Sequence, residues 1–319
     1  MARRPKGEKV DGWLILDKPA GLTSSDCVNR ARRLFNAQKA GHAGTLDPMA
    51  TGVLAIAFGE ATKTVPYAMD ALKTYRFTAI WGTATDTDDA EGKVIETSPV
   101  RPTPEAVLAA LPAFLGLDLV EILHVLPPAY SAVKVDGERA YDLAREGEAV
   151  ELKSRPAYIE RIAVLDTPGA DRTVFEMTTG KGVYVRAFVR DLARRLGTLG
   201  HVGTLRRTRS GAFDESQAIS LEALSDLAYS GAAEKQLHPV ETALDDIPAL
   251  AIGEADAARI RSGQAAPVRG PAFAMAEAML KDAGETPPVL LLTSLQSGRP
   301  VAMAELKLGA FHPLRVFNL

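Results

Sequence analysis

The strongest pattern of apolar and polar positions lies between residues 184 and 196. Apolar side chains recur there at intervals of three and four residues, which predicts an amphipathic helix. They are Val185, Phe188, Val189, Leu192 and Leu196. Arg186, Arg190 and Arg194 follow one another at intervals of four and give the same helix a basic stripe.

A second helical stripe follows a capping sequence near the N-terminus. Thr23 and Asp26 have the spacing of a capping box, which predicts the start of a helix. Apolar residues then share one face of this helix, and arginines lie off that face. The apolar residues are Val28, Ala31, Leu34 and Phe35, and the arginines are Arg30, Arg32 and Arg33.

Runs of β-branched and aromatic residues, bounded by turn-forming residues, predict the strands. These runs cover 13–16, 53–58, 74–83, 130–135 and 201–213, with two further strands inside 157–179 around a turn at 168–171. Short helices are predicted at 60–67, 104–111 and 138–145. Strands and helices interspersed in this way predict a mixed α+β fold.

The pattern changes after Pro248. Short strands separated by turns, such as 289–293 and 301–308, replace the mixture of strands and helices. The sequence therefore predicts a large domain over 11–247 and a small β-rich domain over 248–319. Residues 1–10 are basic and lack the apolar run of a secretory signal, so we expect a flexible tail.

Composition narrows the chemistry that this chain of 319 residues can carry out. Cys27 is its one cysteine, which excludes a disulfide framework and suits a reducing, cytoplasmic location. Its five histidines are scattered without the spacing of metal ligands, so we expect no metal. Because the glycine-rich signatures of dinucleotide and phosphate binding are also missing from the sequence, we expect no cofactor.

Charge is distributed unevenly, although the formal net charge is only −3. Residues 181–209 carry eight Lys or Arg and one Asp, a balance of +7, whereas residues 214–256 carry ten acidic residues and one Lys. A basic segment in an acidic chain is typical of a surface that docks a polyanion, but a solvated helix face gives the same pattern. The apolar stretch at 106–117 is too short to span a bilayer, so no membrane partner is expected.

Residues 41–54 combine one carboxylate, that of Asp47, with several glycines and a proline. An isolated Asp-Pro pair is typical of an ordinary turn. The length of this pattern favours instead an open bend in which a large group, such as a nucleobase, approaches the carboxylate. An aspartate is ionised at neutral pH, and carboxylates act as nucleophiles at sugar carbons. Asp47 is therefore a candidate nucleophile for a reaction at a glycosidic bond.

Several segments, taken in order, resemble the motifs of the bacterial tRNA pseudouridine synthase B (TruB) family. Residues 41–54 resemble its catalytic motif. Further matches lie at 13–21, 73–77, 85–92, 181–186 and 201–207, so that the resemblance covers about 12–213. Ala43 and Met49 stand where the family usually has Thr and Leu. Residues 85–92 form an acidic loop by composition, and Asp88 and Glu91 depart there from the family pattern.

This resemblance implies a reaction and a fold. The reaction is isomerisation of uridine to pseudouridine at position 55 in the T arm of tRNA, after base flipping and without a cofactor. Asp47 would either attack the sugar or base, or deprotonate the sugar, and the sequence leaves both routes open. The implied fold is a mixed, mainly antiparallel sheet of pseudouridine-synthase type, followed by a PUA-like RNA-binding domain.

The resemblance also assigns roles to individual residues. Tyr75 would stack on the uracil, although a tyrosine in a strand is also typical of a packed core. Arg186 would pair with Asp47 and keep it ionised. The pocket would be lined by Tyr184 and Leu205, and the flipped nucleotide would lie near His42 and Asp89. Phosphates would be contacted by Arg190, Arg194, Arg206 and Arg207.

The expected partner is the T arm of tRNA, with no obligate protein partner and a monomeric chain. Two other function classes fit parts of the sequence. One is an RNA-binding or tRNA-folding chaperone in which catalysis is secondary or lost. The presence of Asp47, Tyr75 and Arg186 together argues for catalytic activity, although binding and folding of RNA can accompany it. The other is an enzyme with an aspartate nucleophile that acts on something other than RNA, and the concentrated basic segment counts against it.

Overall fold

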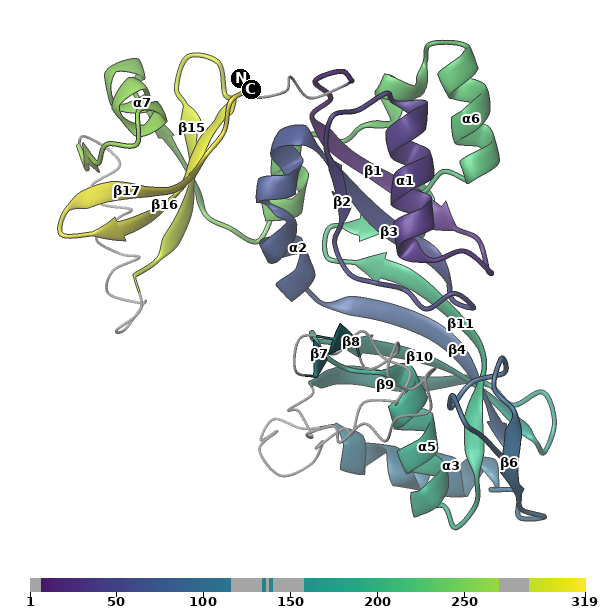
Figure 1. The fold of residues 1–319 in the computed structure, drawn as a ribbon. Coiled ribbons are helices and arrows are strands. Elements are labelled where there is room, and N and C mark those ends of the chain that lie inside the picture. The colour runs from purple at the N-terminus through teal and green to yellow at the C-terminus, as the bar shows by residue number, and fades with distance from the viewer. Residues whose placement is uncertain (1–6, 116–133, 136–137, 140–157, 270–286) are drawn as a thin grey trace.

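The computed structural model describes residues 7–115, 134–135, 138–139, 158–269 and 287–319. Two sheets dominate it: a large eight-stranded sheet with helices packed on it, and a small five-stranded sheet at the C-terminal end (Figure 1). The predicted α+β class, with a mixed and mainly antiparallel main sheet and a β-rich C-terminal part, is confirmed.

The main sheet follows the order β1-β3-β11-β4-β10-β9, with β2 paired to β3 and β12 paired to β11. Its strands are β1 (Gly12–Lys18), β2 (Ala40–His42), β3 (Thr51–Phe58), β4 (Lys73–Trp81), β9 (Ile159–Asp166), β10 (Arg172–Thr179), β11 (Gly200–Ser210) and β12 (Phe213–Asp214). The pairing of β3 with β11 is parallel and covers Thr51 with Arg206 and Gly52 with Arg207. Next to that short pairing lies a cleft between the two halves of the sheet, described below.

Helices cover one face of this sheet. They are α1 (Ser24–Leu34), α3 (Pro104–Ala110), α5 (Val185–Arg195) and α6 (Leu221–Tyr229). The predicted capping box begins α1, with Thr23 accepting from the backbone of Asp26 and Asp26 accepting from that of Thr23. The apolar stripe of α5 is buried, and Phe188 packs edge-on against Phe77 of β4. Both amphipathic helices therefore form where the sequence predicts them.

The other face of β1 and β3 contacts the C-terminal part of the chain. Alternate residues of β1 point to opposite faces, so Leu14 packs under the helices while Trp13 packs with Phe317. Nζ of Lys63 donates to the carbonyl of Val316 at 2.8 Å. Helix α2 (Val65–Asp70) packs on this same face.

The small sheet has the strand order β13-β15-β16-β17-β14 and begins close to the predicted domain boundary. Helix α7 (Glu254–Arg261) packs against it (Figure 1). Its strands are β13 (Ala249–Ile252), β14 (Ala266–Pro267), β15 (Val289–Ser294), β16 (Pro300–Lys307) and β17 (Ala310–Val316). The remaining elements are β5 (Thr83–Thr85), β6 (Val94–Thr97), β7 (Lys134–Val135), β8 (Glu138–Arg139) and five 3₁₀ turns at 59–63, 111–114, 215–217, 233–236 and 240–244.

Two local predictions need correction, and a third lies mostly outside the described residues. The helix expected at 138–145 is wrong at 138–139, which pair with 134–135 as a hairpin, and 140–145 lies outside the described residues. The Asp136-Gly137 dipeptide between these strands is a hairpin signal that outweighs the helical pattern. Of the strand expected at 130–135, only 134–135 is described, and it is β7. The helix expected at 60–67 is instead a 3₁₀ turn followed by α2, which starts one residue before Pro66.

The end of the expected tail also differs from the prediction. The backbone N–H of Glu8 donates to the carbonyl of Asn36, and the carbonyl of Glu8 accepts from Gln38. Val10 is buried. Residues 8–10 are therefore part of the folded body, because Glu8 pairs with the segment after α1 and the side chain of Val10 is buried.

Candidate active site

The loop that carries Asp47 is clamped by a buried lysine. Lys18, at the end of β1, donates from Nζ to the carbonyls of Pro19, Pro48 and Ala50 at 2.9, 3.0 and 2.7 Å. Burial lowers the pKa of Lys18, while the nearby Asp47 acts to raise it. Three carbonyl acceptors fix this side chain as a brace for the loop, which agrees with a structural role for Lys18.

A buried arginine clamps the same loop from the other side. Arg207 of β11 is 1% exposed and donates from Nε to the carbonyl of Val53 and from Nη2 to that of Gly44, at 2.8 and 3.1 Å. Gly52 lies against the backbone of this arginine with a φ of 97°, and a Cβ there would fall 2.2 Å from the Arg207 carbonyl oxygen. Gly52 therefore permits β3 and β11 to meet beside the loop.

Helix α1 holds the loop at a third point. The Oγ of Ser24 accepts from the N–H of Leu46 at 2.9 Å and donates to its carbonyl at 3.1 Å. Asp47 is the next residue, so its carboxylate is placed by backbone contacts to β1, β11 and α1 together. Such bracing holds a reactive group in place before substrate arrives.

Arg186 joins the loop to an acidic turn. It is at the start of α5, its side chain is 4% exposed, and its Nη2 lies 3.0 Å from Oδ2 of Asp47. Its Nη1 donates to the carbonyl of Thr87 at 3.0 Å and lies 3.6 Å from Oδ2 of Asp89. The two ends of the guanidinium therefore hold two separate chain segments, and the predicted pairing of Arg186 with Asp47 is present.

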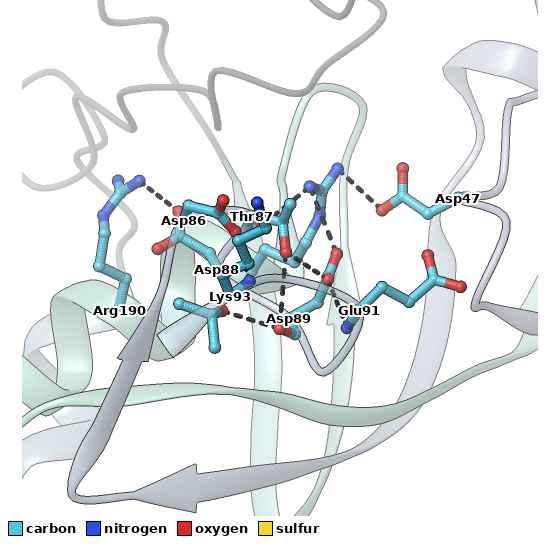
Figure 2. A network of polar contacts seen from close by, with 10 residues as sticks. Asp47, Asp86, Thr87, Asp88, Asp89, Glu91, Lys93 and Arg190 are labelled. Atoms are coloured by element: carbon cyan, nitrogen blue, oxygen red, sulfur yellow. Dashed lines mark hydrogen bonds and ion pairs between the residues drawn. The ribbon is translucent and has the colours of Figure 1, made fainter. Parts of the chain in front are cut away.

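The acidic turn between β5 and β6 is itself closed by hydrogen bonds (Figure 2). Oδ1 of Asp89 accepts from Oγ1 of Thr87 and from the N–H of Glu91, at 2.5 and 3.1 Å. The buried carboxylate of Asp89 thus orders the turn and faces Arg186. At this site the structure brings together Asp47, Asp89 and Arg186 of the predicted set.

Two carboxyl groups in this network have raised pKa values. Burial raises the pKa of Asp47 above its ordinary value, and Arg186 opposes that rise. Burial likewise raises the pKa of Asp88, which pairs with Arg190 at 2.9 Å. A third of the Asp47 side chain is nevertheless exposed, so it remains open to a ligand. Arg186 and, to a smaller extent, Lys18 therefore favour the ionised form of Asp47.

A cleft of about 540 Å³ opens next to the short pairing of β3 with β11. Leu205, Met49 and Phe77 provide part of its apolar lining, and Glu91 of the acidic turn lies at it as well. Tyr75 is half-buried on β4, directly across from Arg207, which in turn lies across from Gly52. The strand register therefore brings Tyr75 and Leu205 to the part of the sheet from which the Asp47 loop extends.

The structure also locates the other predicted pocket residues. His42 is half-buried in β2, opposite Ile56 of β3, at the start of the segment that leads to Asp47. Tyr184 precedes the first turn of α5, two residues before Arg186. In the described part of the chain, no three His, Cys, Asp or Glu side chains are grouped so that they could bind a metal ion.

Sequence comparison identifies the family. A model of the TruB family pseudouridylate synthase N-terminal domain matches residues 32–185, and one of the tRNA pseudouridylate synthase B C-terminal domain matches 186–245. The chain is 54% identical over 319 residues to tRNA pseudouridine synthase B of Caulobacter vibrioides, covering 100% of both. It is 52% identical to that of Bradyrhizobium diazoefficiens, covering 100% of this chain and 91% of the relative.

The chain belongs to the TruB family of pseudouridylate synthases. It is therefore an isomerase, as pseudouridine synthases are. Both family models end before β13, so the small sheet lies outside the matched residues. No helix among the described residues of this TruB member is long and apolar enough to cross a membrane.

Solved structures share the fold. A chain from an H/ACA ribonucleoprotein bound to a substrate RNA containing 2'-deoxyuridine has a TM-score of 0.71 and 21% identity, covering 100% of this chain and 92% of that one. A chain from an archaeal box H/ACA complex has a TM-score of 0.66 and 21% identity, covering 97% and 86%. At this identity, the likeness supports the fold alone.

The four arginines predicted to contact phosphates have different surroundings in this TruB protein. Arg207 is buried against backbone carbonyls, which corrects the expectation that it contacts RNA. Arg206 pairs with Asp17 and Glu215, both at 2.9 Å. Arg190 is largely buried between Asp88 and Asp191. The fourth, at position 194, is exposed and lies 3.7 Å from Asp191.

Several structural residues of this TruB site were not singled out by sequence reasoning. Ser24 lies at the start of α1 and also braces Leu46 of the Asp47 loop. Thr87 lies in the acidic turn, where its carbonyl accepts from Arg186 and its hydroxyl donates to Asp89. These contacts join segments far apart in the chain, so no pattern within a short stretch of sequence predicts them.

Proposed function

We propose that this protein converts uridine 55 in the T arm of tRNA to pseudouridine, with Asp47 as the catalytic carboxylate. The observation that carries the proposal is the 3.0 Å contact between Arg186 and Asp47, beside a cleft with an apolar lining. The buried guanidinium orients the carboxylate and favours its charged form. The names of the full-length relatives, tRNA pseudouridine synthase B, support tRNA as substrate.

The reaction is balanced without a co-reactant. The bond from N1 of uracil to C1' of the ribose breaks, the base turns over, and a bond from C5 to C1' forms. The proton on C5 is lost and N1 gains one, so the product is an isomer of the substrate. Asp47 either adds to the substrate or removes a proton from the sugar, and both routes need an ionised carboxylate near the ribose.

The target base must leave its stack to reach Asp47, at a cost of a few kcal/mol. Tyr75 is proposed to stack on the flipped uracil, and Leu205 to bound its pocket. His42, Asp89 and Tyr184 are proposed to lie close to the nucleotide, and Arg194 to contact phosphate. The cleft supports this proposal, since Leu205 lines it beside Met49.

The small β-rich sheet is proposed to be a PUA-like RNA-binding domain over 248–319. A chain that modifies tRNA is in turn proposed to work in the cytoplasm, which fits its single cysteine. Both proposals depend on the tRNA substrate, so they are tested after it.

The decisive experiment incubates the protein with an unmodified tRNA transcript and maps pseudouridine along the product. The parent protein is expected to modify the T-arm uridine. Asp47→Asn is expected to bind the same transcript while its turnover falls by on the order of 10⁴-fold. Absence of pseudouridine at that position would reject the substrate assignment, and substantial activity in Asp47→Asn would reject the role of Asp47.

A further inference from the structure

A second hollow of about 520 Å³ lies between α1 and α6. Leu22, Leu34 and Leu221 form its apolar lining. Arg30 and Arg33 of α1 lie at it, and Glu222 is the one carboxylate among its described lining residues. We call these residues and the hollow that they line the α1–α6 groove. The catalytic site described above does not use it.

The arginines of this groove differ in their contacts from Arg186 and Arg190 of α5 and from Arg206 and Arg207 of β11. Arg30 and Arg33 are exposed, as is Arg32 next to them. Across the described ranges, the guanidinium of none of the three forms an ion pair or a hydrogen bond. Arg30 attracts Asp26 one turn earlier on α1, and apart from this interaction the charge of the three arginines is available to an external anion.

The α1–α6 groove adjoins the cleft next to the pairing of β3 with β11. Pro19 lines the groove, and the next residue, Ala20, lines the cleft. Gly21 follows, and its N–H donates to the carbonyl of Pro48, beside Asp47. One short turn thus separates the two hollows, so a single extended ligand can occupy both.

The length of α1 sets the span of such a ligand. Ser24 holds the Asp47 loop at the start of α1, and Arg33 lies nine residues further along. At 1.5 Å per residue that is a rise of roughly 14 Å, equal to about five base steps of an A-form RNA stem. The groove is therefore at the distance of a stem that adjoins a loop bound at Asp47.

We propose that the α1–α6 groove binds the phosphate backbone of the RNA stem next to the loop that carries the target uridine. This inference rests on the proposed function, since it takes the substrate to be a folded RNA. Double-stranded RNA is recognised largely by shape and by contacts to phosphate and ribose. Arg30 and Arg33 supply the charge, and the leucines keep the groove open and apolar between them.

The test measures dissociation constants for a T-arm hairpin and for full-length tRNA over a range of salt concentrations. Arg30→Gln with Arg33→Gln is expected to weaken binding of both RNAs by about five- to tenfold near physiological salt. The slope of log K against log salt is expected to fall by about one for each arginine. Turnover at saturating RNA is expected to stay at the parent value, with KM raised.

Two matched variants act as controls. Arg30→Lys with Arg33→Lys keeps both charges and is expected to restore most of the affinity and the slope. Glu222→Gln removes the carboxylate at the groove and is expected to tighten binding by about twofold. If the two arginines only stabilised the fold, removing the carboxylate of Glu222 would not tighten RNA binding.

The possible results separate this proposal from the proposed function. If the variant Arg30→Gln with Arg33→Gln forms pseudouridine with the KM and the salt slope of the parent, the groove proposal is wrong. The proposed function is not affected by that result. A weakening seen only with full-length tRNA would overturn the assignment to the adjoining stem. Failure of the parent protein to modify the transcript would reject the proposed function. The role of the groove would then be tested by the salt dependence of RNA binding alone.

Discussion

Arg186 of α5 and Arg207 of β11 are as conspicuous in the sequence as Arg30 and Arg33 of α1, but the two pairs have opposite surroundings. Arg186 and Arg207 are buried and bind carboxylates or carbonyls of the protein itself. Arg30 and Arg33 are exposed beside a groove. The first two contact or brace the Asp47 loop, and the other two form no ion pair among the described residues. A local balance of charge therefore does not identify the surface that meets a polyanion.

The difference arises from pairing between distant segments. Arg206 meets Asp17, which precedes it by 189 residues, and Arg190 meets Asp88, which precedes it by 102. The balance of +7 over 181–209 is thus partly neutralised by carboxylates from other strands and turns. Four comparisons of variants, ordered by the size of the expected effect, test whether this contrast holds.

The largest effect is expected at the catalytic loop. Arg186→Lys keeps a positive charge but loses the planar fork that reaches Asp47 and Thr87 together. We expect turnover to fall by about 10²- to 10³-fold with little change in RNA affinity. Single-turnover kinetics on the tRNA transcript, with a separate binding measurement, check this. Arg30→Lys is the control, and a loss of turnover there or none at Arg186 would remove the distinction between the two groups.

The next effect is on stability. Arg207→Met leaves the carbonyls of Val53 and Gly44 without a donor, so we expect a loss of about 2 kcal/mol in the free energy of unfolding. Arg209→Met changes an exposed arginine two residues further along β11 and is expected to change little. Urea unfolding of both variants measures the difference. Equal midpoints would show that the burial of Arg207 does not brace the loop.

Much of the fold was predictable because local patterns carry it. The stripe of α5 and the capping box of α1 are visible in short windows, and both form as expected. The pairing of 134–135 with 138–139 departs from the predicted helix, because the Asp136-Gly137 sequence favours a hairpin over the helical pattern.

The candidate site was predictable in part. Asp47 and Arg186 were found through the resemblance to a family, and their contact is present. The bracing by Ser24 and the burial of Arg207 were not found, because each depends on an acceptor from another strand or loop. Contacts of this kind are set by tertiary packing, which a single sequence does not display.

A smaller effect is expected on RNA binding through α5. Arg190→Gln removes a cation that already pairs with Asp88 and Asp191, so the salt slope should change by less than it does for Arg30→Gln. Arg194→Gln removes an exposed cation and should lower the slope by up to about one. Filter binding over a salt series compares the three variants. If the salt slope falls most for Arg190→Gln, arginines paired within the protein would contribute more to RNA binding than exposed ones, contrary to the expectation.

The smallest effect is a difference in the sign of pH dependence between the two regions. Burial raises the pKa of Asp47, so ionisation destabilises the fold at neutral pH, and the cost disappears as pH falls from that raised pKa towards 3.8. Asp47→Asn should therefore be slightly more stable than the parent at neutral pH and lose this advantage in acid.

Asp26 on α1 has the reverse behaviour. Hydrogen bonds from the side chain and the backbone of Thr23 lower its pKa below 3.8, so its stabilising effect is present above 3.8 and is lost as pH falls through the lowered pKa. Asp26→Asn should be less stable than the parent at neutral pH, with a deficit that shrinks in strong acid. Unfolding midpoints of both variants between about pH 7 and pH 3 test the pair. If both differences had the same sign at neutral pH, burial would not be the dominant influence on Asp47.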